Sequence, residues 1–391
     1  MTPDPVPRAD VLFYVQHLLG IGHVQRAAII ARALGRAGLK VVLVTGGPPV
    51  PGLDAGAAHV VQLPPLRTRD ETFSELVDLD GRPIDDAWKA ARAEHLCAVY
   101  RAAAPRVLMT EMFPFGRRQL RFELLPLLEA ARAATPRPHI VCSLRDVLTD
   151  PSKPGKAQWM VDTFGRLFDL VLVHGDPDVL PLARSFPMAA GFADKIRYTG
   201  YVVREPTPIG TPGNGDEVVV STGGGAVGAR LIQAALAARG DTPLANDIWR
   251  ILIGHGLPES AYGDLVRTAP TGVVVERARP DFPALLARAR LSISQAGYNT
   301  VLEVLAAGVP AVVVPFAAGG ETEQSLRARV FAAHGLLTVV EEAQLSGPRL
   351  AAAVVEALAP AAGTRGALAL RTDGATETAR LVADLAAIVA P

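Results

Sequence analysis

The chain has 391 residues and a formal net charge of +0, with 39 basic and 39 acidic side chains. This balance gives no general attraction to nucleic acid, and we expect no nucleic-acid partner. The length exceeds one typical domain, and a hydrophobic content of 49% is enough for two cores. The chain has neither a basic-then-apolar leader nor an apolar run near the roughly 18 residues of a membrane span. We therefore expect a cytoplasmic protein, with peripheral contact at the inner membrane face left open.

The first half alternates β-rich runs with helices rich in alanine and leucine. A helix is predicted from about Val24 to Ala37, because Val24, Ala27, Ala28, Ala31 and Leu34 share one face. Short apolar runs predict strands at 11–15, 40–45, 106–110, 139–143 and 170–173. These runs are continuously apolar, as in strands buried on both faces, so the pattern predicts a doubly wound parallel sheet of the α/β class.

A second sheet domain is predicted after a linker. Residues 204–216 are crowded with proline and glycine, which favours a linker between an N-terminal domain at 1–203 and a C-terminal domain at 217–375. Further strands are predicted at 217–221, 249–253, 272–276, 291–294, 311–315 and near 337–340. The last segment, 376–391, is expected to be a helix that can pack back on the first domain. Ligands bind beyond the carboxyl ends of parallel strands, so those ends are the places to search for a site.

Four titratable residues follow strands of the first domain: His23, Glu111, Asp146 and His174. His23 follows Gly20-Ile-Gly22, and an imidazole there suits removal of a proton from a hydroxyl. Its alternative is a histidine at a helix start that faces solvent. Glu111 can partner this base or orient a substrate, or it can form an ion pair with Arg117 or Arg118. Asp146 can simply pair with its neighbour Arg145.

The segment His174-Gly-Asp176-Pro-Asp178 contains an Asp-x-Asp pattern. Such a pair can hold a metal ion, as in metal-dependent sugar transferases. With a proline between the carboxylates, a turn and helix cap is the favoured interpretation. We therefore expect no metal site.

The second domain opens with Ser221-Thr-Gly-Gly-Gly225-Ala-Val-Gly228, which matches the glycine spacing of a dinucleotide fingerprint. NAD binding also needs an acidic residue closing the next strand, and that strand ends at Ile253-Gly-His255 without one. A more general hypothesis remains, in which the glycine loop and the helix N-terminus hold a diphosphate.

Residues 292–316 predict a strand, a glycine turn, a helix and a second strand, with Glu303 in the first turns of the helix. Helix amides bind phosphate, and a nearby carboxylate can bind two ribose hydroxyls, which suggests a nucleotide-sugar site. The alternative is a capping box formed by Thr300 and Glu303, which needs no ligand. Likewise Glu323-Gln324 can bind a sugar or simply begin a helix.

Several stretches of the second domain resemble the C-terminal domain of family 28 glycosyltransferases, which include the peptidoglycan UDP-N-acetylglucosamine transferase and the plant monogalactosyldiacylglycerol synthases. The similar stretches are Ser221–Ala226, Asp281–Ala289, Gln295–Glu303, Gly308–Phe316 and Glu323–Ala328. The motifs at 111–117, 174–177, 198–202 and 292–300 are similar to those of a branch of predicted bacterial glycosyltransferases.

The resemblance implies a GT-B fold, inverting transfer and no cofactor or obligatory metal. By matched position, Glu303 is expected to bind ribose, and Glu323 and Gln324 the donor sugar. The loop of Ser221, Gly223, Gly224 and Gly225 should approach the diphosphate. Gly297, Asn299 and Thr300, at the start of the following helix, are also expected to bind the donor. The segment from Arg277 to Phe282 should flank the base. His23 matches a histidine that ends the family's N-terminal glycine loop, although that loop is richer in glycine than this one.

The sequence therefore predicts an inverting glycosyltransferase that uses a nucleotide sugar, with UDP the expected nucleotide. His23 and Glu111 are the expected catalytic residues, and Gly22, Arg117, Asp146 and His174 are expected on the acceptor side. The acceptor is a lipid, a glycan or a small natural product. The alternatives are a nucleotide-sugar epimerase or hydrolase of the same fold, and a non-catalytic donor-binding subunit.

Overall fold

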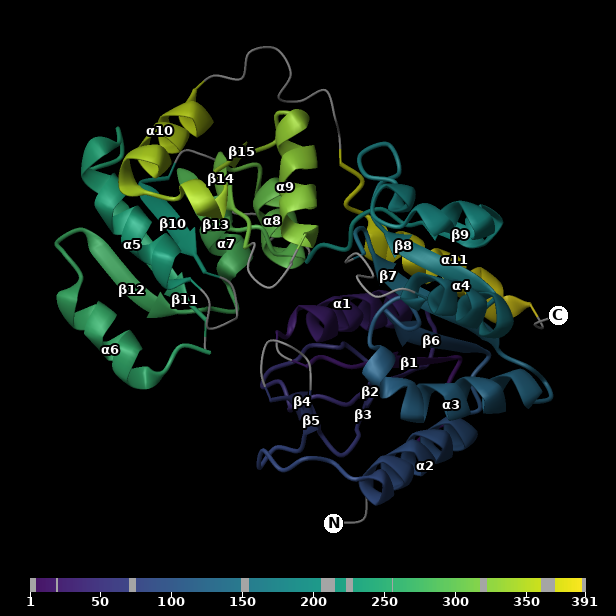
Figure 1. Ribbon diagram of the computed structural model, residues 1–391. Coiled ribbons are helices and arrows are strands. Elements are labelled where there is room, and N and C mark those ends of the chain that lie inside the picture. The colour runs from purple at the N-terminus through teal and green to yellow at the C-terminus, as the bar shows by residue number, and fades with distance from the viewer. Residues whose placement is uncertain are drawn as a thin grey trace. The chain divides into compact units, whose positions relative to one another are not determined.

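The structure is a computed structural model that describes residues 5–18, 20–69, 75–148, 155–204, 215–222, 228–254, 256–316, 322–359 and 370–388. The chain divides into two compact units (Figure 1). Unit 1 comprises Met1–Val202 and Leu370–Pro391, and unit 2 comprises Val203–Ala369. The chain returns to unit 1 at Leu370, which is earlier than residue 376, where we expected the last segment to begin.

Unit 1 contains, in its described residues, a seven-stranded parallel sheet in the order β3-β2-β1-β6-β7-β8-β9. The strands are β1 (Val11–Val15), β2 (Val41–Thr45), β3 (His59–Gln62), β6 (Val107–Glu111), β7 (His139–Arg145), β8 (Leu170–His174) and β9 (Ile196–Tyr198). A separate antiparallel pair, β4 (Arg67–Thr68) and β5 (Leu76–Val77), lies in the long polar loop before α2.

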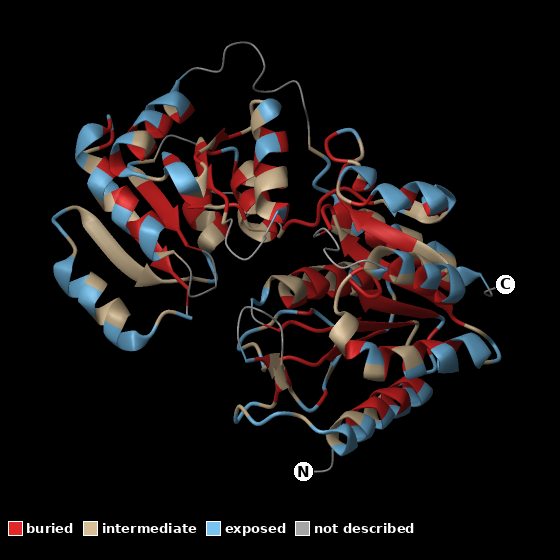
Figure 2. Ribbon diagram, viewed as in Figure 1, coloured by how far each residue is buried: buried red, intermediate tan, exposed pale blue. Residues whose placement is uncertain are grey.

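Helices cover both faces of this sheet. The helices of unit 1 are α1 (Gly22–Arg36), α2 (Asp86–Ala103), α3 (Arg121–Ala133), α4 (Lys156–Leu167) and α11 (Gly374–Ala387), with short 3₁₀ helices η1 (Arg118–Leu120), η2 (Leu182–Arg184) and η3 (Pro187–Lys195). Successive side chains of β1 point to opposite faces, so Val11 and Phe13 pack with α1 and α11 while Leu12 and Tyr14 pack with α2 and α3. All five residues of β1 are buried for this reason (Figure 2).

The chain re-enters unit 1 through a close backbone contact. Tyr201 N donates to Arg371 O at 2.6 Å, and Gly374 N donates to Tyr201 O at 3.0 Å. A Cβ atom on Gly374 would lie 2.4 Å from Gly200 O, so only glycine fits there. Helix α11 then packs along α1.

Unit 2 contains, as far as it is described, a six-stranded parallel sheet in the order β12-β11-β10-β13-β14-β15. The strands are β10 (Glu217–Ser221), β11 (Ile248–Ile253), β12 (Val273–Arg277), β13 (Leu291–Gln295), β14 (Ala311–Val314) and β15 (Thr338–Val339). The helices are α5 (Ala229–Ala238), α6 (Glu259–Thr268), α7 (Phe282–Ala287), α8 (Tyr298–Ala307), α9 (Glu323–Ala333) and α10 (Gly347–Leu358), with η4 (Arg239–Asp241) and η6 (Glu342–Gln344).

Helices α5 and α10 pack together on one face of this sheet, and α7 and α8 pack together with α8 against β13 (Figure 1). The strand order reverses between β10 and β13, which is the topological switch point where open α/β sheets bind ligands. The expected α/β fold of two doubly wound parallel sheets is confirmed.

The predicted strands agree with the observed ones to within about two residues at their ends, but β3, β9 and the β4–β5 pair were not predicted. Both cysteines, Cys97 and Cys142, are free and buried.

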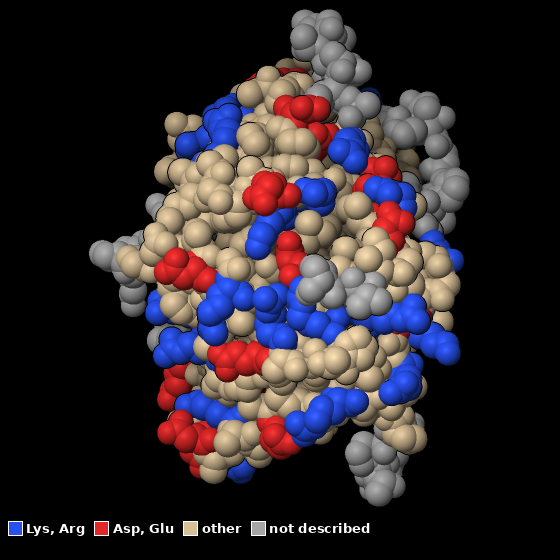
Figure 3. Space-filling view, turned by 90° about the vertical axis from the view of Figure 1, so that its right-hand side faces the viewer, with Lys and Arg blue, Asp and Glu red and all other residues tan. Residues whose placement is uncertain are grey.

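Basic and acidic side chains are interspersed over the face in Figure 3, where basic ones also gather in a band. Among the described helices, none combines the length and apolar character that crossing a membrane requires.

Candidate functional site

The carboxyl ends of β1 and β6 bring two predicted catalytic residues together. Helix α1 begins at Gly22, so His23 lies in its first turn, and Glu111 is the last residue of β6. Because β1 and β6 are paired in parallel, their carboxyl ends are adjacent. His23 Nδ1 lies 2.9 Å from Glu111 Oε1. The sequence pattern placed both residues at strand ends, and the fold joins them.

Glu111 is a buried acceptor for two side chains. Arg26, one helical turn beyond His23, donates to the same Oε1 atom. Glu111 is 1% exposed, whereas the His23 side chain is 17% exposed. The described residues thus pair Glu111 with His23 and Arg26, not with Arg117 or Arg118. With Nδ1–H donated to Glu111, the Nε2 atom of His23 is the ring nitrogen left to accept a proton.

The surroundings keep His23 neutral and Glu111 charged. Burial is the largest cause that lowers the pKa of His23, to about 3; Glu111 opposes this effect, and Arg117 and Arg145 add to it. Burial alone would raise the pKa of Glu111, but His23 and Arg26 outweigh it and lower that pKa to about 2. A neutral imidazole held by a carboxylate is the protonation state that a general base requires.

His174 and Asp146 lie at neighbouring strand ends, but His174 is fully engaged. Its Nε2 lies 2.8 Å from Ser143 Oγ, and its Nδ1 lies 2.9 Å from Thr199 Oγ1. The side chain is completely buried, which lowers its pKa to about 3 with help from Arg26. This arrangement favours a structural role, and acceptor contact by His174 stays a prediction. Asp146 is also buried and packs tightly on Gly175.

The Asp-x-Asp segment forms a turn. Asp176 Oδ1 accepts from the backbone N of Asp178 at 3.1 Å, and the Asp176 carbonyl accepts from Val179 and Leu180. This geometry is an Asx turn, which agrees with the turn that we favoured from the sequence. No group of three or more histidine, cysteine, aspartate or glutamate side chains gathers as a metal site within the described ranges.

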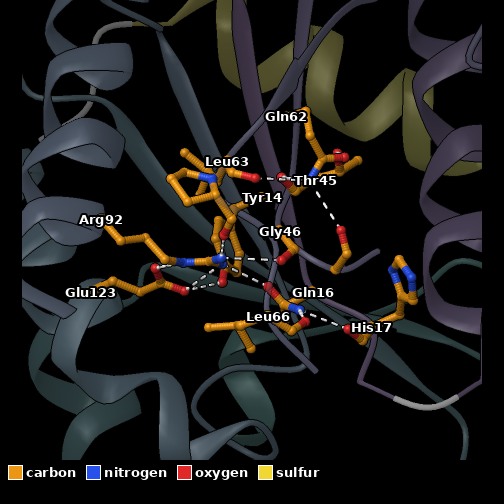
Figure 4. A network of polar contacts seen from close by, with 12 residues as sticks. Tyr14, Gln16, His17, Thr45, Gly46, Gln62, Leu63, Leu66, Arg92 and Glu123 are labelled. Carbon is orange, nitrogen blue, oxygen red and sulfur yellow. Dashed lines mark hydrogen bonds and ion pairs between the residues drawn. The ribbon is translucent and has the colours of Figure 1, made fainter. Parts of the chain in front are cut away.

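A buried polar network fixes the segment that leads from β1 to His23 (Figure 4). Arg92 Nε donates to Glu123 Oε2 at 2.6 Å, and Tyr14 Oη donates to Glu123 Oε1 at 2.5 Å. Arg92 Nη2 donates to Gln16 Oε1 at 2.7 Å, and Gln16 Nε2 donates to His17 O at 2.7 Å. Both charged side chains are fully buried, so their charges are compensated only by each other and by these polar groups.

In unit 2, Glu303 lies in the second turn of α8 without a capping partner. Helix α8 begins at Tyr298 with Gly297 as its N-cap, and no side chain caps it, so the capping box of Thr300 and Glu303 is not formed. The Glu303 side chain is 14% exposed and forms an ion pair with Arg204, whose Nε lies 3.9 Å from Glu303 Oε1. Burial raises the pKa of Glu303 to about 7, and Arg204 opposes this effect. Such a carboxylate is suited to accept hydrogen bonds from a ligand.

The first turn of α9 contacts the end of β14 and the start of α8. Gln324 Oε1 accepts from Phe316 N at 3.1 Å. Glu323 is buried and pairs with Arg327, whose Nη2 lies 2.6 Å from Glu323 Oε1. Arg327 also lies over the Tyr298 ring at 5.2 Å. Glu323 is therefore held by an arginine, and its contact with a donor sugar stays a prediction.

The remaining predicted donor residues surround the same strand ends. Ser221 ends β10, Asn299 lies in the first turn of α8, and Phe282 begins α7. Arg277 donates to Gly254 O at 3.1 Å and to Leu257 O at 3.0 Å, which fixes the loop after β11. Gly223, Gly224 and Gly225 lie outside the described residues. A cavity of about 220 Å³ lies at the start of α5 and is lined by Gly228, Ala229, Arg230, Leu231, Gln295, Val314, Phe316, Glu342 and Leu345.

Three arginines with contacts in these sites were not predicted. Arg26 lies three residues after His23 in a helix, a spacing that puts both on one face and that offered a usable signal. Arg327 lies four residues after Glu323 in α9, a spacing that also puts both side chains on one face of a helix. Arg204 is distant from Glu303 in sequence, and nothing in the motif pattern indicated their contact.

Solved structures share this architecture across nearly the whole chain. A structure of CalG4, the calicheamicin glycosyltransferase, has a TM-score of 0.60 at 19% identity and covers 98% of this chain and 100% of its own. MurG of Acinetobacter baumannii has a TM-score of 0.54 at 15% identity and covers 98% and 99%. A UDP-glucosyltransferase from Polygonum tinctorium has a TM-score of 0.63 at 15% identity, also covering 98% and 99%. The chain thus has the GT-B fold of glycosyltransferases.

Sequence comparison refines this class for the second half of the chain. Residues 218–378 match the glycosyltransferase family 28 C-terminal domain. A UDP-N-acetylglucosamine–N-acetylmuramyl-(pentapeptide) pyrophosphoryl-undecaprenol N-acetylglucosamine transferase of Brucella abortus (strain S19) is 31% identical over 216 residues, covering 52% of this chain and 56% of the relative. The chain thus spans about half the length of the curated relatives it matches. The similarity to family 28 is therefore shown for the stretch 218–378.

Proposed function

We propose that this protein is an inverting glycosyltransferase that moves a sugar from a nucleotide diphosphate sugar, most simply a UDP-sugar, to an acceptor hydroxyl. The observation that carries the proposal is the 2.9 Å contact between His23 Nδ1 and Glu111 Oε1 at adjacent strand ends. A neutral histidine whose tautomer is fixed by a buried carboxylate is equipped to activate a hydroxyl. The GT-B fold and the family 28 domain supply the context of sugar transfer.

In this proposal His23 Nε2 accepts the proton of the acceptor hydroxyl as its oxygen attacks the anomeric carbon. The new glycosidic bond forms while the bond from the anomeric carbon to the diphosphate oxygen breaks, so the nucleoside diphosphate leaves. A single displacement of this kind inverts the anomeric configuration. Glu111 stabilises the imidazolium that forms, and Arg26 fixes the position of the Glu111 carboxylate.

For the donor, we assign the ribose hydroxyls to Glu303, which is half-buried and forms no capping box with Thr300. We assign binding of the diphosphate to Ser221, Gly223, Gly224 and Gly225. The start of α8, at Gly297, Asn299 and Thr300, contributes to the same binding. The base is assigned to the segment from Arg277 to Phe282, and the sugar to Glu323 and Gln324. The names of the Brucella relative and the Polygonum structure both refer to UDP-sugar enzymes, which supports UDP as the nucleotide.

The acceptor class is a lipid, a glycan or a natural product, in keeping with the lipid-linked and natural-product names among the relatives. We propose that transfer needs neither cofactor nor metal and no nucleic-acid partner. We further propose a cytoplasmic location, with peripheral contact at the inner membrane face. The alternatives remain an epimerase or hydrolase of this fold, and a donor-binding subunit without its own catalysis.

A thermal-shift panel of nucleotide sugars, followed by assay of the best donor against an acceptor library, tests the proposal. We expect stabilisation by UDP-sugars and a product whose anomeric configuration, read by NMR, is inverted. Free or epimerised sugar formed without an acceptor would favour the hydrolase or epimerase. Donor binding without turnover by the purified chain, restored by a second protein, would favour the donor-binding subunit.

A further inference from the structure

Arg327 joins the start of α9 to the turn that precedes α8. Its side chain is fully buried, and its Nη2 donates to Glu323 Oε1 at 2.6 Å. Its Nη1 donates to Ala296 O at 3.4 Å, and its guanidinium lies 5.2 Å from the centre of the Tyr298 ring. Ala296 and Tyr298 flank Gly297, the N-cap of α8. Arg327 thus contacts both the turn that we assign to the diphosphate and a residue that we assign to the donor sugar.

The contacts of Arg327 fix the position of the Glu323 carboxylate. Glu323 lies one helical turn before Arg327, so the two side chains share a face of α9. A guanidinium is a rigid planar fork, and here one of its nitrogen atoms is held by Ala296 O while the Tyr298 ring holds the guanidinium by a cation–π contact. The place of the carboxylate therefore depends on the turn before α8 as well as on α9.

The charge of Arg327 bears on the kind of ligand group that Glu323 can accept. Glu323 is 3% exposed, and a buried carboxylate is costly unless a cation pairs with it. Arginine is always charged in proteins, so Arg327 supplies that cation. An ionised carboxylate only accepts hydrogen bonds. Sugar hydroxyls can therefore donate to it, whereas a second carboxylate is repelled.

The neighbouring residue supplies the opposite hydrogen-bonding capacity. Gln324 Oε1 accepts from Phe316 N at 3.1 Å, which ties the first turn of α9 to the end of β14. An amide whose oxygen accepts in this way has Nε2 as its donor end. Glu323 and Gln324 therefore place an acceptor and a donor next to each other. This pair suits the hydroxyls of a neutral sugar, because a hydroxyl can both donate and accept.

Resting on the proposed function, we propose that Arg327 is a positioning residue of the donor-sugar site and that its pairing with Glu323 restricts the donor to neutral sugars. Arg327 acts through Glu323, which it holds where a sugar hydroxyl can donate to the carboxylate. The negative charge of Glu323 repels a sugar that carries its own carboxylate. Because other residues bind the nucleotide, loss of Arg327 changes recognition of the sugar and leaves UDP binding nearly intact.

Calorimetric titration of the full-length protein with UDP, UDP-glucose and UDP-glucuronate tests this inference. Arg327→Met keeps the length of the side chain without its charge, and it should weaken UDP-glucose binding about 10- to 100-fold, the scale of a hydrogen bond to a charged group. The affinity for UDP should change by less than about threefold. Arg327→Lys keeps the charge and should restore part of the loss. Arg329→Met is the matched control, because Arg329 is exposed on the same helix and pairs with Glu341.

A double variant keeps the test decisive if Arg327→Met fails to fold. Glu323→Gln combined with Arg327→Met leaves no unpaired charge in the interior. Repulsion of the uronate is then absent, so the ratio of UDP-glucose affinity to UDP-glucuronate affinity should fall about tenfold. A role of the pair in folding alone would weaken both sugar nucleotides alike, and an unchanged ratio would therefore overturn the proposal.

Two further outcomes would overturn it: UDP-glucose affinity that folded Arg327→Met leaves unchanged, and a wild type that binds UDP but not UDP-glucose or that prefers UDP-glucuronate. In each of these outcomes UDP binding by the wild type separates the failure from failure of the proposed function, because UDP carries no sugar for Glu323 to contact. A wild type that binds neither UDP nor UDP-glucose would contradict the UDP donor and this inference together.

Discussion

His23 Nδ1 and Glu111 Oε1 lie 2.9 Å apart, although 88 residues separate them in the chain. The same carboxylate oxygen accepts from Arg26. A buried glutamate with two donors cannot rotate freely, so the imidazole is held in one tautomer with Nε2 available. This relationship defines the chemistry that we assign to unit 1.

His23→Ala should lower turnover about 10²- to 10⁴-fold, the usual contribution of a general base, while UDP affinity changes little. His23→Gln keeps hydrogen bonding to Glu111 but not basicity, so it should fail nearly as badly. Steady-state kinetics with the identified acceptor, beside calorimetry with UDP, checks both. Near-full turnover by His23→Gln would remove His23 from the role of base.

The pH profile gives a second check on His23. Its pKa lies at about 3, below the ordinary 6.5, because the folded protein disfavours the imidazolium. Between these values the unfolded chain binds a proton that the folded chain does not, so His23 makes stability rise with pH across this window. In the free enzyme the acidic limb of kcat/KM should therefore lie well below pH 6.5. An acidic limb of kcat/KM at pH 6.5 would contradict the buried, neutral histidine.

Glu303→Ala should weaken UDP binding by about 1.5–3 kcal/mol, the scale of hydrogen bonds to a charged group. The fold should be retained, because Glu303 caps nothing in α8. The pKa of Glu303 is about 7, so protonation below that pH should weaken UDP binding in the wild type and not in Glu303→Ala. Calorimetry at several pH values measures this, with Glu356→Ala on the exposed face of α10 as the control. Unchanged UDP affinity in folded Glu303→Ala would contradict the ribose assignment.

Turnover should persist in EDTA. The Asp176–Asp178 segment is occupied in a turn, where Asp176 Oδ1 accepts from Asp178 N. Product formation is measured with and without chelator, and then with added manganese or magnesium. Complete loss of activity that either metal restores would overturn the expectation and return Asp176 and Asp178 to consideration as ligands.

Arg92→Leu should destabilise unit 1 by about 3–5 kcal/mol, because it leaves the Glu123 charge buried without its partner. Urea unfolding measures the change, and Arg132→Leu at a more exposed ion pair serves as the control. Replacing Arg92 and Glu123 together by apolar residues should cost less than the single change. A loss below about 1 kcal/mol for Arg92→Leu, the range of surface pairs, would show that the network does not hold the segment after β1.

The sequence by itself determined the two-sheet architecture, because continuously apolar strands, glycine stops and helical periodicity are local patterns. It also placed His23, Glu111 and Glu303 at strand ends or helix starts. Four strands escaped it: β3 has a half-exposed pattern, β9 is three residues long, and β4 and β5 have two residues each, so none gives a strong local signal.

Only the tertiary structure decided which strand-end residues meet. The capping box of Thr300 and Glu303 is a valid local pattern, but α8 begins earlier, at Tyr298, so Glu303 lies in the second turn and does not cap the helix. Glu111 accepts from Arg26 and not from its sequence neighbours Arg117 and Arg118. The reason is that parallel pairing of β1 with β6 brings the start of α1 beside the end of β6. Such choices depend on sheet order and on the direction of each side chain after packing. Residue spacing along the chain does not contain that information.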